Sequence, residues 1–250
     1  MRGFWPIYKR EMFSLFVTPL AWVLIATFLA VQGIHFFIIV AHYAGGAADL
    51  SADGGPVQAF FGQTVLLYLP LLFVCPLLTM RLFAEERRSG TIEALLTAPV
   101  STLGVVLAKY GAALTTYLVM WAPTIFYMVL VARTGGELDV RVVGTSYLAV
   151  AAVGAGYLAI GTMTSAFTKS QLTAAVLSSM IGIGLFMLGI GDFVFDEGAF
   201  HSISQHVSVW AQMNDFSKGI VDLRRLVYDA TVVVLPLFVT VRTVDSWRWG

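Results

Sequence analysis

A short charged segment near the middle of the chain has the residue types and spacing of a docking element. Glu85 to Arg88 are four acidic and basic residues in a row, and a Ser-Gly pair ending at Gly90 follows them. Arginines at the end of a helix complement its carbonyl-rich terminus, and a glycine lets the chain turn sharply. The pattern fits a rigid segment that binds a partner, and it also fits an ordinary solvated turn.

The residues after this turn predict a short helix with a small apolar face. Glu93 points away from that face and can pair with a basic group on a partner or on the N-terminal segment. Pro99 stops the helix, and Ser101 can cap the next one. The face consists of residues at three- and four-residue steps, namely Ile92, Leu95 and Leu96. An apolar face inside a polar loop favours docking over the solvated turn.

Other kinds of chemistry find little support in the sequence. No phosphate-binding G-x-x-x-x-G-K-[ST] motif is present, because Lys169-Ser170 lacks the preceding glycines. Cys75 is the single cysteine, which excludes an intramolecular disulfide and leaves a small core residue as the expected role. The four histidines match no metal-binding spacing, so we expect ordinary, hydrogen-bonded residues near the membrane interface: His35, His42, His201 and His206.

The elements that must position the docking segment are membrane spans. Of the 250 residues, 58% are hydrophobic and 12% are charged, too few charges to cover a soluble globule. The 15 basic and 15 acidic residues balance, so the sequence has no nucleic-acid-binding charge pattern. Five stretches of 22 to 37 residues contain no Lys, Arg, Asp or Glu, and a spanning helix needs roughly 20 apolar residues.

A sixth span is expected near the C-terminus. It contains Asp229 and Arg242 near its two ends, from which both side chains should reach the interface. Glycines concentrate in the fourth and fifth spans, which indicates close helix packing. The sequence therefore predicts an all-α integral membrane protein with six transmembrane helices, near residues 19–41, 58–80, 109–131, 143–166, 171–191 and 226–244.

The loop charges and two flanking segments complete the expected topology. Ten basic residues fall on the side of the termini and five on the other side, so both termini are expected in the cytoplasm. Residues 3–18 carry apolar side chains on one helical face and predict an interfacial helix. The coupling loop spans 81–100. The outer loop, 192–225, is semi-apolar, and it either folds back towards the bilayer or forms a folded cap.

The charged segment also carries a family resemblance. Residues 85–100 read Glu-Glu-Arg-Arg-Ser-Gly-Thr-Ile-Glu-Ala-Leu-Leu-Thr-Ala-Pro-Val, which resembles the second cytoplasmic loop of type-2 ATP-binding-cassette (ABC) exporter permeases. Residues 215–229 look like the segment before the last span in the gliding-motility and nitrous-oxide-reductase-maturation branch. The positions that match the loop pattern are Glu85, Glu86, Arg87, Gly90, Thr91, Ile92, Glu93, Leu95, Leu96 and Pro99.

The resemblance implies a single transmembrane permease domain over 1–250 that forms half of a translocation path. The short helix would be the coupling helix that docks on the ATPase, and the N-terminal interfacial helix would be a second contact. Two separate ATPase subunits would hold ATP and Mg²⁺, so this chain would be no enzyme and bind no cofactor. A second permease, identical or paralogous, would complete the path in the inner membrane of a prokaryote.

Two other classes of function remain open. The first is a membrane scaffold of an ATPase-linked motility or assembly machine that moves no substrate. The second is an ion-coupled carrier, which is disfavoured because the first five spans place no acidic or basic residue at mid-membrane. The sequence does not identify a substrate.

Overall fold

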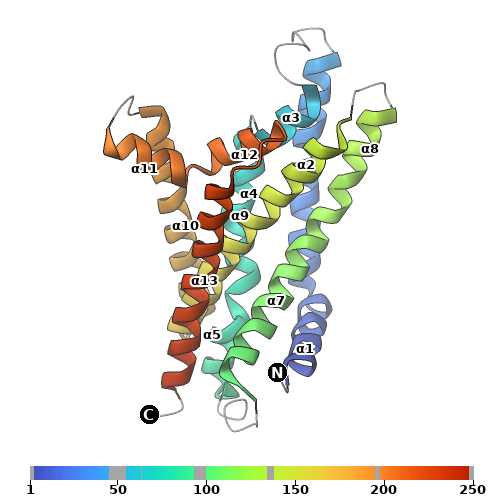
Figure 1. Ribbon diagram of the computed structural model, residues 1–250. Helices are drawn as coiled ribbons and strands as arrows, with labels where there is room; N and C mark the ends of the chain where they lie inside the picture. The colour runs from blue at the N-terminus through green and yellow to red at the C-terminus, as the bar shows by residue number, and fades with distance from the viewer. Residues whose placement is uncertain are drawn as a thin grey trace.

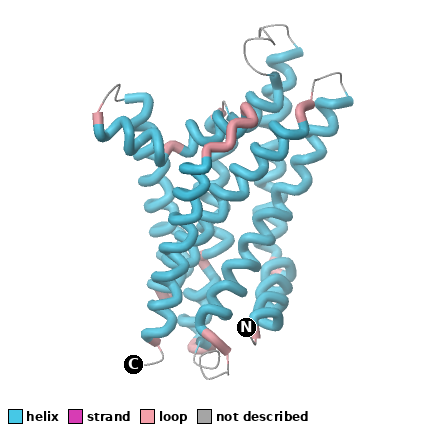
Figure 2. Tube along the Cα trace, in the orientation of Figure 1, coloured by secondary structure: helices cyan, strands magenta, loops and turns pink. Residues whose placement is uncertain are grey.

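The computed structural model describes residues 3–44, 55–62, 64–92, 100–133, 138–194 and 198–247. Throughout these residues every regular element is a helix (Figure 2). The chain is an all-α, multi-pass membrane protein with five helical segments long and apolar enough to cross a bilayer. These are α2 (Pro19–Ala44), α7 (Thr102–Trp121) continued by η2 (Ala122–Thr124) and α8 (Ile125–Arg133), α9 (Val140–Phe167), α10 (Gln171–Val194) and α13 (Leu223–Ser246).

The region of the expected second span, 58–80, is not one continuous helix. It is divided into α3 (Gly55–Gly62), η1 (Val65–Leu67) and α4 (Tyr68–Thr79), which run on into α5 (Arg81–Ser89). Pro70 lacks the backbone N–H that a continuous helix needs, and it disfavours helix just before it, whereas Pro76 lies inside α4. The pieces still follow one another from one end of the bundle to the other (Figure 1). A sixth membrane crossing stays a prediction.

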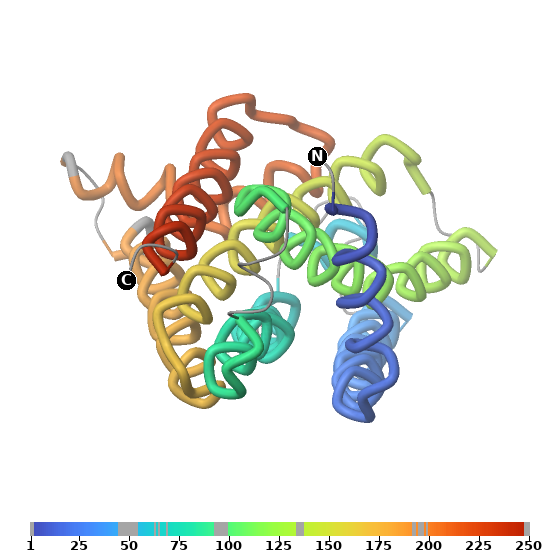
Figure 3. The backbone as a smooth tube through the Cα atoms, turned by 90° about the horizontal axis from the view of Figure 1, so that it is seen from below, coloured from blue at the N-terminus to red at the C-terminus, as the bar shows by residue number. Residues whose placement is uncertain are grey.

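Helix α9 is the central helix of the bundle. It packs against α4, α5, α7, α10, α12 and α13, and in the view along the bundle it lies in the middle (Figure 3). Glycines make this possible: a Cβ on Gly154 would lie 2.2 Å from the ring of Tyr117, and one on Gly161 would lie 2.0 Å from Thr79 Oγ1. The predicted close packing of the glycine-rich helices is confirmed at these positions.

The two ends of the bundle differ. Both termini lie at the end that carries α5, called the α5 end below (Figure 1). The opposite end, called the α12 end, carries α11 (Ala199–Val207) and α12 (Val209–Ser217). Met213 and Phe216 of α12 are buried, and the Thr145 hydroxyl donates to the Phe216 carbonyl at 2.7 Å. Within the expected outer loop, α12 therefore folds back onto the bundle.

The N-terminal segment forms α1 (Phe4–Val17) beside the α5 end of α7. Ile7 and Leu15 are buried, and the Tyr8 hydroxyl donates to Thr115 Oγ1 at 2.8 Å. Trp5 and Phe13 are 58% and 73% exposed. The apolar residues of α1 thus divide between the bundle and the outside. The position of α1 in the headgroup plane stays a prediction.

Candidate functional site

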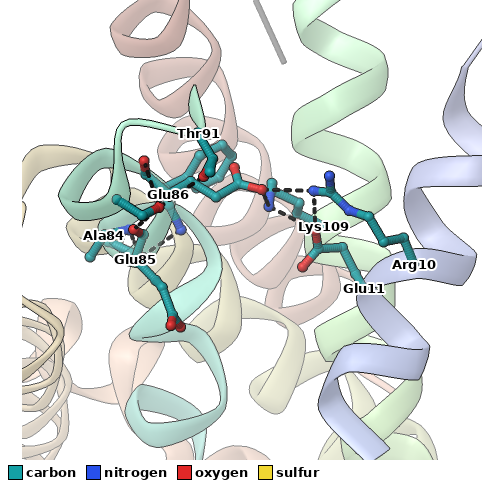
Figure 4. Close-up of polar contacts among 10 residues, drawn as sticks. Arg10, Glu11, Ala84, Glu85, Glu86, Thr91 and Lys109 are labelled. Atoms are coloured by element: carbon teal, nitrogen blue, oxygen red, sulfur yellow. Dashed lines mark hydrogen bonds and ion pairs between the residues drawn. The ribbon is translucent and has the colours of Figure 1, made fainter. Parts of the chain in front are cut away.

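Four charged side chains from three helices meet at the α5 end (Figure 4). Lys109 Nζ of α7 lies 2.9 Å from Glu11 Oε1 of α1 and 3.0 Å from Glu86 Oε1 of α5. Arg10 Nη2 of α1 lies 2.8 Å and 2.7 Å from the same two oxygens. Two cations alternate with two anions, so this charged cluster is neutral and joins α1, α5 and α7.

The charged cluster is largely withdrawn from solvent. The Lys109 side chain is 1% exposed, the two glutamates are 13% and 16% exposed, and Arg10 is 56% exposed. Lys109 Nζ also lies 5.3 Å from the centre of the Phe83 ring, a cation–π distance. A buried ammonium keeps its charge only when it is paired, so Lys109 depends on both carboxylates.

The electrostatics of Glu11 follow from this pairing. Burial by itself would raise the pKa of its carboxyl group. The charges of Lys109 and Arg10 and their hydrogen bonds outweigh burial, and the pKa of Glu11 is lowered below its ordinary value. Glu86 Oε2 is buried and has no hydrogen-bond partner among the described residues. A cavity of about 200 Å³ borders the cluster, lined also by Ser14 and Arg81.

The first turn of α5 is held by a single hydroxyl group of α9. Ser165 Oγ accepts hydrogen bonds from the backbone N–H groups of Phe83 and Ala84, at 3.1 Å and 3.2 Å. The same hydroxyl donates to the Met80 carbonyl at 2.9 Å. The first N–H groups of a helix have no partner inside the helix, so Ser165 satisfies two of them and fixes α5 against α9.

The last turn of α5 is held by Arg87. Its Nη1 donates to the Ala166 carbonyl at the end of α9 at 2.8 Å. Its guanidinium also lies 4.6 Å from the ring centre of Trp247, which follows α13. A cation at a helix C-terminus is stabilised by the helix dipole, and stacking on an aromatic ring adds to this. Arg87 therefore ties α5 to α9 and α13, on the side opposite the charged cluster.

The structure places the predicted docking residues in three groups. Glu86 and Arg87 are the anchors of α5 just described. Glu85 is exposed, and Figure 4 shows its carboxylate pointing away from the charged cluster. Gly90 has φ 72°, so the predicted sharp turn is confirmed, and Ser101 caps α7 as predicted by accepting from the Gly104 N–H at 3.1 Å.

Of the remaining docking residues, Thr91 is exposed, Ile92 is partly buried and the others lie outside the described part. Thr91 Oγ1 lies 2.9 Å from Ser89 Oγ. Ile92 is partly buried and packs against the core of the bundle, so it contributes less to an exposed face than the sequence indicates. Glu93, Leu95, Leu96 and Pro99 lie outside the described residues.

Two polar side chains lie deeper than the sequence indicates. His35 is 1% exposed, and its ring pairs with Gln32 and Thr64. Asp229 is 7% exposed, and its carboxylate accepts a hydrogen bond from the Gln212 amide at 2.5 Å. Over the described part of the chain, no three His, Cys, Asp or Glu side chains gather in a way that could hold a metal ion.

Lys109 is the functional residue that sequence reasoning assigned to the wrong environment. It is one of the ten basic residues counted on the side of the termini and stands at the start of the expected span 109–131, but it is the eighth residue of the helix that begins at Thr102. Its signal was a lone lysine in an otherwise apolar helix. The site as a whole fixes α5 to its neighbours: the charged cluster joins it to α1 and α7, and Ser165 and Arg87 join it to α9 and α13.

Comparison with known proteins identifies the family of the chain. The family described as ABC-2 family transporter protein matches residues 49–239, which include α5, Lys109 and Ser165. No curated protein matches the chain. The family match covers well over half of the sequence. The chain therefore belongs to the ABC-2 transporter family and is a membrane permease of an ABC transporter.

Proposed function

We propose that this permease forms half of the translocation path of an ATP-driven exporter, and that residues 91–99 dock on a separate ATPase subunit. The observation that carries the proposal is the attachment of α5. This helix leads directly into residues 91–99, and it is fixed to four other helices, by Glu86 on one side and by Ser165 and Arg87 on the other.

This attachment lets a force on the docking segment reach the spans. Glu86 is paired with Lys109, which is 1% exposed, and withdrawal of Glu86 would leave this buried ammonium with one of the cluster's two carboxylates, that of Glu11. The attachment to α7 therefore resists a displacement of α5 alone. Arg87 extends the same constraint to the ends of α9 and α13. ATP and Mg²⁺ on the ATPase would supply the energy. This chain would bind the ATPase, couple its motion to the spans and change conformation with it.

The assembly that we propose has two permeases and two ATPase subunits. One permease cannot enclose a path alone, so the second is another copy or a paralogue. We place the complex in the inner membrane of a prokaryote, with both termini in the cytoplasm. The bias of ten basic residues to five supports this orientation. The resemblance over residues 215–229 supports the gliding-motility and nitrous-oxide-reductase-maturation branch.

The docking role is tested by co-purification of the ATPase with permease variants at matched membrane levels. Leu95→Ala combined with Leu96→Ala should reduce ATPase recovery ten-fold or more, because truncating central apolar anchors of an interface weakens binding strongly. The matched control is Ile220→Ala with Leu223→Ala, which truncates two exposed apolar residues outside the docking segment. Equal ATPase recovery by the two double variants would disprove docking at residues 91–99.

Coupling is tested separately from docking. Glu86→Gln and Glu85→Gln each remove one negative charge from adjacent positions, but only Glu86 belongs to the charged cluster. Glu86→Gln should retain the ATPase and lose transport-linked ATP hydrolysis, whereas Glu85→Gln should resemble the parent in both. Identical behaviour of the two variants would contradict coupling through α5. Full cellular function with a hydrolysis-dead ATPase would favour the scaffold instead.

A further inference from the structure

A small pocket opens between α9, α10 and α13 towards the α12 end. Its volume is about 30 Å³, room for one compact chemical group. Most of its lining is apolar, and it includes Val153 and Leu185. The polar exceptions are Tyr157, Tyr228 and one carboxylate, that of Asp229. An apolar pocket with a few convergent polar groups is the usual form of a small-molecule site.

The carboxylate of Asp229 has incomplete charge compensation. Its Oδ2 accepts from Gln212 Nε2 at 2.5 Å, while Oδ1 has no hydrogen-bond partner among the described residues. The nearest cation on its own helix is Arg225, one turn away, and this guanidinium is held by Asp215 at 2.9 Å and by two backbone carbonyls. Two carboxylates therefore share one arginine, and this group of side chains has a net charge of −1.

The chemistry of the pocket selects its ligand. A buried carboxylate is costly without a cationic partner, so a ligand cation beside Asp229 would be stabilised. A divalent metal ion needs several oxygen ligands, and the lining offers a single carboxylate. A primary ammonium group can donate hydrogen bonds to the carboxylate, whereas a trimethylammonium group has no N–H to donate. The apolar walls suit the carbon atoms next to that ammonium group.

We propose that this pocket binds the protonated primary amine of an amphipathic molecule, with Asp229 as its counter-charge. Asp229 Oδ1 would accept from the ammonium group. Binding as such needs only the pocket. The assignment of such amines as the transported substrate class rests on the exporter function proposed above.

The experiment measures binding of dodecylamine to the purified full-length permease in nanodiscs, without the ATPase. We expect a saturable component with the parent protein that is at least ten-fold weaker in Asp229→Asn. This variant is almost isosteric and keeps an oxygen acceptor for Gln212. The matched control is Asp222→Asn, which removes the same charge from the start of the same helix, where asparagine also caps well. Its amine binding should equal that of the parent.

Two further measurements separate charge from shape. Val153→Leu adds a methylene to the pocket wall and leaves every charge in place, so it should also weaken dodecylamine binding. This variant tests the proposal if Asp229→Asn does not fold. Dodecanol and dodecyltrimethylammonium should show no saturable component in the parent. Equal dodecylamine binding by parent and Asp229→Asn, or equal saturable binding of dodecanol, would overturn the proposal.

The outcomes also distinguish this site from the proposed exporter function. Suppose that dodecylamine shows no saturable binding, while the Leu95/Leu96 double variant loses the ATPase. This result would disprove the amine site and leave the docking role supported. Conversely, suppose that amine binding is saturable and depends on Asp229, while ATPase recovery in that double variant is unchanged. That result would support the amine site and disprove the docking role.

Discussion

Substitution of Lys109 by Met tests whether the charged cluster is an energetic unit. Methionine has a similar length and is apolar, so it fills the space but leaves Glu11 and Glu86 without their buried partner. Removing one member of a buried ion pair costs roughly 3–5 kcal/mol. Arg10 still lies 2.8 Å and 2.7 Å from the two carboxylate oxygens and compensates them in part. We therefore expect a loss of about 2–3 kcal/mol in the free energy of unfolding, below the full penalty.

The decisive measurement is a double-mutant cycle, read as unfolding of the purified permease in detergent. In Lys109→Met the cluster has a net charge of −1, and adding Glu86→Gln restores neutrality with the Arg10–Glu11 pair intact. The double variant should be more stable than the sum of the single losses by about 1–2 kcal/mol. The control cycle pairs Lys109→Met with Glu85→Gln and should be additive within about 0.5 kcal/mol. Additivity in both cycles would refute the coupling of α5 to α7.

Three other predictions concern Glu11, Gly90 and the topology. Because the pKa of Glu11 is lowered, its carboxylate contributes fully to stability above the ordinary glutamate pKa, and this contribution is lost as the pH falls through the lowered value. The difference in unfolding free energy between the parent and Glu11→Gln should therefore shrink on acidification below about pH 4.3. Gly90→Ala should lower stability by about 1–2 kcal/mol through its φ of 72°, whereas Gly144→Ala, in helical conformation and open space, should not. Reporter fusions after Gly250 should be cytoplasmic and those after Gly135 external; the reverse result would overturn the orientation.

The sequence predicts those parts of the fold that depend on local chemistry. Long runs without charged residues identify four of the five segments that are long and apolar enough to cross a bilayer, because such a segment needs about 20 apolar residues. The fifth, α13, is the expected sixth span, which carries Asp229 and Arg242. Ser101 and Gly90 are found at the start and end of helices, because capping and a positive φ are properties of single residues. Close packing of α9 follows from its glycines in the same way.

The remaining features depend on partners that are distant in the chain. The pairing of Lys109 with Glu11 joins residues 98 positions apart, and no local pattern signals it. The carboxylate of Asp229 is buried and accepts a hydrogen bond from Gln212 of α12, a partner 17 positions away that the sequence does not indicate. The division of the second span depends on Pro70, which the sequence displays, but also on how α3 packs against α12.

Two helices connect the parts of the molecule to which we assign docking and ligand binding. Helix α9 presents Ser165 to α5 at one end and Val153 to the pocket nearer the other. Helix α13 carries Asp229 in the pocket and ends beside Trp247, which stacks on Arg87 of α5. The two helices pack along each other, so neither can tilt at the α5 end without changing the walls of the pocket. A motor that displaces α5 would therefore act on the pocket through α9 and α13 together, and a ligand that occupies the pocket would resist the same displacement.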